Sequence, residues 1–119
     1  MNLQELSIKA PIVNADIKTH VFVCTGASCS NNESQATLEK FWEVLKSREL
    51  LYGKRGSKEG TVLVTTCGSM GFCATGPAVL IYPEGVWYHS VQAQDVEELV
   101  DKHILEGKVV ERLLGYRMG

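Results

Sequence analysis

Four cysteines are the residues of this chain whose type and spacing are best suited to chemistry. Four residues separate Cys24 from Cys29, and five separate Cys67 from Cys73. A zinc knuckle grips one small ion with a tight turn, whereas a [2Fe–2S] cluster spans two iron atoms and accommodates longer loops. Neither pair has the Cys-x-x-Cys spacing of a thioredoxin-type dithiol. The spacing therefore favours a cluster. The alternatives are a zinc site, a disulfide or redox dithiol, and inert thiols.

Each cysteine pair follows a segment that is expected to be a buried β-strand. Residues 20–24 and 61–65 are short and rich in β-branched residues, and each is followed by a loop of small residues. Between them, residues 33–49 are predicted to form a helix, because apolar residues recur at helical spacing at Leu38, Phe41, Trp42 and Leu45. Strands joined through a helix are expected to be parallel. If they are neighbours, both loops leave the same edge of the sheet and the four sulfur atoms converge.

The second half of the chain is expected to complete a small mixed sheet. Residues 78–82 are apolar on both faces, which indicates a central strand, and residues 86–88 are the other arm of a hairpin. A second helix is predicted over residues 93–105, and residues 109–114 are expected to pack back on the core. The glycine-rich polar stretch 53–60 is expected to be a solvated surface loop. The predicted fold class is therefore α/β, with a small mixed β-sheet flanked by helices.

Composition and charge are those of an ordinary globular domain. Hydrophobic residues make up 45% and charged residues 22% of the 119 residues, which argues against disorder. Twelve basic and fourteen acidic residues give a net charge of −2, so nothing favours binding to nucleic acid. The longest apolar run, residues 78–82, is far shorter than a membrane helix, and the N-terminus lacks the apolar core of a signal peptide. We therefore expect a cytoplasmic protein without a membrane partner.

Several segments of the sequence resemble the thioredoxin-like [2Fe–2S] ferredoxin family. The segments that carry the similarity are residues 20–24, 73–88, 95–104 and 107–114. The most specific of them contains Gly-Pro and ends in Tyr-Pro-Glu-Gly-Val-Trp-Tyr. The same module resembles an iron–sulfur subunit of respiratory complex I and the N-terminal domain of flavin subunits in NAD-linked hydrogenases. On this resemblance we expect an N-terminal arm at residues 1–18, the ferredoxin domain at 19–114 and a C-terminal tail at 115–119.

The resemblance implies a thioredoxin-like fold and a one-electron carrier that is not an enzyme. It also implies a single [2Fe–2S] cluster held by four cysteines in two loops, here Cys24, Cys29, Cys67 and Cys73. A homodimer is implied as well, together with redox partner proteins such as a flavoprotein, a hydrogenase or a nitrogenase-linked protein. The alternatives are a small iron–sulfur subunit of an NAD-linked dehydrogenase or hydrogenase complex, and a cluster-free thioredoxin-like binding protein.

The second loop departs from the family pattern, which is Thr-Gly-Cys-x-Gly-x-Cys. The usual position of the third ligand is occupied by Ser69, and a cysteine stands two positions earlier, at Cys67. Three interpretations compete: Cys67 replaces the ligand, Ser69 binds iron through its oxygen, or the site has lost its cluster. We favour Cys67 because a thiolate is a softer and better ligand for iron than a hydroxyl oxygen.

Overall fold

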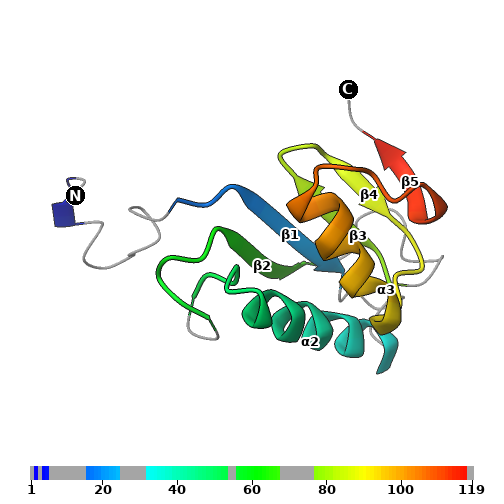
Figure 1. The fold of residues 1–119 in the computed structure, drawn as a ribbon, viewed down its shortest axis with the longest axis horizontal. Coiled ribbons are helices and arrows are strands. Elements are labelled where there is room, and N and C mark those ends of the chain that lie inside the picture. Colours follow the sequence, from blue (N-terminus) through cyan, green and yellow to red (C-terminus); the bar gives the residue numbers. More distant parts are fainter. Residues whose placement is uncertain are drawn as a thin grey trace.

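The structure of the chain is a computed structural model, and it describes residues 2, 4–5, 16–24, 32–53, 56–67 and 77–117. Within these residues, one mixed sheet of five strands lies against two helices (Figure 1). The strands follow one another across the sheet in the order β2-β1-β3-β4-β5. This arrangement confirms the predicted α/β class with a small mixed sheet.

The first half of the fold is the predicted strand–helix–strand unit. Strands β1 (Thr19–Cys24) and β2 (Val62–Cys67) are parallel neighbours, and helix α2 (Asn32–Ser47) lies between them in the chain. Strand β2 is longer than the sequence indicated, because it continues through residues 66 and 67 in register with β1. The cysteine at position 67 therefore belongs to the strand and not to the loop after it.

The third and fourth strands form the predicted hairpin. Strand β3 (Val79–Tyr82) pairs antiparallel with β4 (Val86–Tyr88) on one side and with β1 on the other. It is therefore the central strand, as its apolar sequence indicated. The turn between the two strands contains a cis peptide bond between Tyr82 and Pro83, and Gly85 has a φ of 69°, a conformation that suits glycine.

The second helix begins at Ala93 as predicted. Helix α3 (Ala93–Glu98) continues without a break into the π-helical segment η3 (Leu99–Leu105). The helix begins with a reciprocal cap, in which the backbone N–H of Gln92 donates to Asp95 Oδ2 at 3.0 Å. It ends at Leu105, and Gly107 two residues later has a φ of 72°, the left-handed conformation that often follows the end of a helix.

The chain then returns to the sheet through an element that the sequence did not predict. A 3₁₀ turn, η4 (Glu111–Leu113), leads into β5 (Leu114–Arg117), which pairs antiparallel with β4. This short strand contains a glycine and lacks a clear apolar alternation, so that the sequence indicated only a packed segment. β5 also extends into the residues expected to form the tail. The division of the chain into arm, domain and tail stays a prediction.

One hydrophobic core lies between the sheet and the two helices. Alternate residues of the inner strands are fully buried, as the two-residue period of a strand requires. The strand residues in this core include Val21, Val23, Val79, Ile81, Val86 and Tyr88. The helix residues in it include Leu38, Phe41, Leu45, Val96, Leu99 and Val100. Both helices therefore cover the same face of the sheet (Figure 1).

The opposite face of the sheet has no helix packed on it among the described residues, and we call it the open sheet face. Besides the paired positions Cys24 and Cys67 at its end, the residues that the strand register places there are Leu63, Thr65, His20, Phe22, Leu80, Tyr82, Trp87 and Tyr116. None of them is an acidic residue, a lysine or an arginine. Leu80 on this face is buried, and Tyr116 is exposed.

Candidate metal centre

Strands β1 and β2 end side by side, and each ends on a cysteine. Cys24 is the last residue of β1, Cys67 is the last residue of β2, and the two are register partners in the parallel ladder. Neighbouring strands lie about 4.8 Å apart. In Figure 1 the two arrows point in the same direction and finish together. One position from each cysteine pair is thus brought to the same edge of the sheet.

The remaining candidate ligands, Cys29, Cys73 and the alternative Ser69, lie outside the described residues. The structure does place the ends of the segments that contain them. Segment 25–31 leaves from Cys24 and arrives at α2, whereas segment 68–76 leaves from Cys67 and arrives at Pro77. The four-cysteine ligand set and the choice of Cys67 over Ser69 therefore stay predictions.

Cys24 occupies a position without contact to solvent. The residue is completely buried, and its backbone N–H donates a hydrogen bond of 2.9 Å to the carbonyl oxygen of Ala78, which is also completely buried. Iron–sulfur clusters are held by thiolates, and the exclusion of water around them helps to set their reduction potential. A buried thiol beside a second cysteine position is therefore a donor set that fits one side of a [2Fe–2S] cluster.

A second metal site is not present in the described part of the chain. Among these residues, no group of three or more His, Cys, Asp or Glu side chains is arranged to hold a metal ion. Within the same ranges, no helix combines the length and the apolar character that crossing a membrane demands.

His20 lies on the same strand as Cys24 but serves the packing of the open sheet face. Its ring stacks on Phe22 with a centroid distance of 4.0 Å, and its Nε2 lies 2.9 Å from the Thr65 hydroxyl. Partial burial lowers the pKa of His20 below its ordinary value, because an apolar environment disfavours the charged ring. These contacts indicate a structural role for His20.

His103 belongs to a buried polar cluster on the other face. It lies on η3, and its exposure is 2%. The Tyr88 hydroxyl is hydrogen-bonded to His103 Nδ1 at 2.5 Å and accepts the backbone N–H of Val110 at 3.1 Å. The other ring nitrogen of His103, Nε2, lies 3.8 Å from Glu84 Oε1.

Burial is also the main cause that lowers the pKa of His103. Glu84 opposes this effect, and Arg117 on β5 adds to it. The sequence did not reveal the partnership with Tyr88, because the two residues are 15 positions apart on different elements. The only signal was a polar residue on an otherwise apolar helical stripe.

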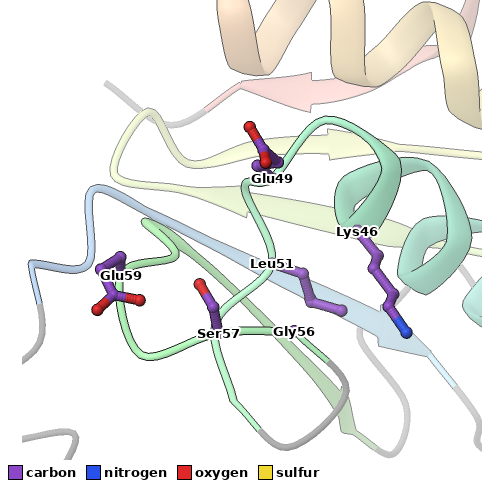
Figure 2. A pocket seen from close by; sticks show the side chains of 6 residues that line it. All are labelled: Lys46, Glu49, Leu51, Gly56, Ser57 and Glu59. Atoms are coloured by element: carbon purple, nitrogen blue, oxygen red, sulfur yellow. The ribbon is translucent and has the colours of Figure 1, made fainter.

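A surface hollow of about 520 Å³ lies at the opposite end of β2 from Cys67. Its lining comes from the end of α2 and the loop that follows, and consists of Lys46, Glu49, Leu51, Gly56, Ser57 and Glu59 (Figure 2). The charged side chains in it do not converge on a common point (Figure 2). None of its described lining residues is a histidine or a cysteine, and we assign no chemistry to it.

Comparison with known proteins identifies the family. The family model of the thioredoxin-like [2Fe–2S] ferredoxins matches residues 13–103. The chain belongs to this ferredoxin family. A 2Fe-2S ferredoxin of Clostridium pasteurianum is 42% identical to it over 104 residues, which span 81% of this chain and 94% of the relative. A 2Fe-2S ferredoxin of Aquifex aeolicus is 36% identical over 103 residues, which span 80% of this chain and 86% of the relative.

Solved structures of this ferredoxin family show the same fold. The structure of a thioredoxin-like [2Fe–2S] ferredoxin from Aquifex aeolicus matches with a TM-score of 0.72 at 32% identity, over 87% of this chain and 94% of that chain. A second structure, of the wild-type ferredoxin from the same organism, matches with a TM-score of 0.69 at 31% identity, over 84% of this chain and 98% of that chain. The predicted family, thioredoxin-like fold and cofactor are thereby confirmed. The chain is an iron–sulfur electron carrier, and its cofactor is a [2Fe–2S] cluster.

Proposed function

We propose that this ferredoxin carries one electron at a time on a [2Fe–2S] cluster held by Cys24, Cys29, Cys67 and Cys73. The observation that supports this most strongly is the register pairing of Cys24 with Cys67 at the ends of two parallel strands. When bound, the cluster supplies a centre that accepts and releases an electron. The protein supplies four thiolates, and because cysteines must lose their protons to bind metal, assembly weakens at low pH.

We favour Cys67 over Ser69 as the third ligand for two reasons. Position 67 lies beside Cys24 in the ladder, so that its backbone is held at the site by strand pairing. A thiolate is also a better ligand for iron than a hydroxyl oxygen. Neither argument requires the segment 68–76 to adopt a particular conformation.

The functional unit in this proposal is a homodimer formed through the open sheet face. Each strand contributes apolar or aromatic residues to this face, and none of them is an acidic residue, a lysine or an arginine. A face that binds its own copy must avoid net charge, because each copy brings the same charges. The ring centroids of Trp87 and Tyr116 lie 5.1 Å apart, and aromatic side chains of this kind are enriched at the centres of protein interfaces.

The proposed partners are redox proteins, for example a flavoprotein, a hydrogenase or a nitrogenase-linked protein, which this carrier meets transiently in the cytoplasm. It has no substrate of its own in this proposal and is not an enzyme. The competing assignment is a permanent iron–sulfur subunit of an NAD-linked dehydrogenase or hydrogenase complex. The apolar open sheet face would then contact another subunit. Stable co-purification with a flavoprotein at a fixed ratio would favour this assignment.

Anaerobic purification followed by reductive titration tests the proposed function. We expect iron and acid-labile sulfide at two each per chain, as the family's cluster type requires, and the uptake of one electron per chain. The reduced protein should give an EPR signal, and NADH alone should not be oxidised. Colourless protein without acid-labile sulfide would refute the carrier, and steady oxidation of NADH by the isolated chain would show that it is an enzyme.

A further inference from the structure

A chain of buried hydrogen bonds runs behind the candidate site and joins the ends of both ligand-bearing segments. The backbone N–H of Cys24 donates to Ala78 O at 2.9 Å, which ties the start of segment 25–31 to the residue pair that follows segment 68–76. The neighbouring carbonyl, Pro77 O, accepts the backbone N–H of Val91 at 2.9 Å. The carbonyl of Val91 accepts the hydroxyl of Thr37 at 2.8 Å.

Thr37 makes the last hydrogen bond of this series. It lies on α2, the element at which segment 25–31 arrives. The series of hydrogen bonds therefore runs from Cys24 through Ala78, Pro77 and Val91 to α2, while register pairing holds Cys24 beside Cys67. The other hydrogen bonds of the series join backbone atoms, so Thr37 contributes its one side chain.

The contact made by Thr37 is not the usual one for a threonine in a helix. A helical threonine hydroxyl commonly donates to a carbonyl one turn earlier in the same helix, whereas Thr37 donates to a residue 54 positions away. The side chain is completely buried, and a buried hydroxyl or carbonyl without a partner is costly. Loss of the hydroxyl would leave the Val91 carbonyl without this donor and would loosen the link between α2 and residues 77–78.

We propose that Thr37 is a positioning residue of the cluster site. Its hydrogen bond to Val91 O sets the place of α2 relative to Pro77 and Ala78, and these are the points at which the segments that contain Cys29 and Cys73 end. This inference rests on the proposed function, since it assumes that both segments bind one cluster. The role of Thr37 is to hold the ligands in place and not to touch the cluster.

The substitution Thr37→Val tests this role, and Thr37→Ser is its matched control. Valine keeps the shape of the side chain but removes the hydroxyl, whereas serine keeps the hydroxyl. We expect Thr37→Val to release iron to a chelator about two- to tenfold faster, as the loss of one hydrogen bond allows, and to shift the EPR g-values and the reduction potential. Thr37→Ser should restore the wild-type EPR signal and potential.

The possible outcomes separate this inference from the proposed function. A wild-type protein without a cluster would refute the carrier itself. A coloured wild type, together with a Thr37→Val variant that is less stable but has unchanged EPR signal, potential and iron release, would refute the positioning role alone.

Should Thr37→Val fail to fold, hydrogen exchange of the wild type decides the question. Cluster binding should slow exchange at the amides of Cys24 and Val91 more than at Tyr52, whose N–H donates to Val62 O at the other end of β2. Equal slowing at all three amides would refute the positioning role.

Discussion

Cys24 and Cys67 occupy the same register position of the β1–β2 ladder, each as the last residue of its strand. The hydrophobic core holds this register. Val21 and Val23 of β1 are completely buried beneath the helices, and a slip by one residue would turn them towards the open sheet face. The same packing that stabilises the fold therefore keeps the two cysteine positions together.

Removal of any one of the three cysteines other than Cys67, for which Ser69 is the alternative ligand, should abolish cluster binding. We expect Cys24→Ala, Cys29→Ala and Cys73→Ala each to lower the iron content of the purified protein by about tenfold or more, since even outer-shell changes cost about 10–100-fold in metal affinity. Iron and sulfide analysis with visible spectra measures this. A variant that keeps the full wild-type spectrum would remove its cysteine from the ligand set.

The buried pair of His103 and Tyr88 should make stability depend on pH. Because the pKa of His103 in the folded protein is lowered, the unfolded chain takes up a proton first as the pH falls. The contribution of the neutral, buried His103 ring to the stability of the fold is fully present above the ordinary histidine pKa of about 6.5. It is lost as the pH falls through the lowered pKa of His103 in the folded protein. Protonation of the ring would also place a charge beside the buried Tyr88 hydroxyl.

Urea unfolding of the apoprotein between neutral and mildly acidic pH measures this effect. Each proton taken up by the unfolded state changes the free energy of unfolding by at most about 1.4 kcal/mol per pH unit. The variant His103→Gln cannot titrate, and its slope should be smaller. His20→Gln should reduce the slope as well, because burial also lowers the pKa of His20 in the folded protein. An unchanged slope in His103→Gln would show that His103 does not contribute.

In the loop after α2, a side chain at Gly56 should destabilise the fold. A Cβ atom at Gly56 would overlap the carbonyl oxygen of Leu51, a fixed backbone atom. We expect Gly56→Ala to lower the free energy of unfolding by about 1–3 kcal/mol, a usual cost of overpacking. Ser57→Ala, at an exposed neighbour, should change it by less than about 0.5 kcal/mol. Equal stability of the two variants would show that the loop is merely solvated, as the sequence suggested.

The proposed dimer should dissociate when a charge is placed on the open sheet face. Tyr116 and Leu105 are both 52% exposed, but Tyr116 lies on this face and Leu105 on the helix η3. Tyr116→Glu should weaken the dimer by about tenfold or more, because a charge is costly to bury at an apolar interface. Leu105→Glu should leave it intact. Sedimentation at several concentrations measures both, and a monomeric wild type would contradict the dimer.

Much of the fold could be predicted from the sequence, because its signals are local. The apolar alternation of β1 and β3, the helical stripe of α2 and the turn after Tyr82 each depend on neighbouring residues. Strand β5 escaped prediction because its pairing with β4 stabilises a segment that has little strand character of its own. The end of β2 was placed too early, since pairing with β1 extends that strand through Cys67.

The candidate site was predicted only in part, for a related reason. The order of the strands predicted that the two loops follow parallel neighbours. In the structure, Cys24 and Cys67 are paired at the ends of these strands, as expected. The hydrogen bonds that surround this place join residues distant in sequence, such as Thr37 and Val91, and no sequence pattern indicates them. The choice between Cys67 and Ser69 depends on the path of segment 68–76, which local patterns do not determine.

EPR and iron analysis of the anaerobically purified variants Cys67→Ser and Ser69→Ala test whether Cys67 is a ligand of the cluster. If Cys67 is the ligand, Ser69→Ala keeps the wild-type iron content and EPR signal. Cys67→Ser then loses the cluster or shows an altered signal, because an oxygen replaces a thiolate. The reverse result, an unchanged Cys67→Ser variant and a Ser69→Ala variant without cluster, would contradict the proposed ligand set.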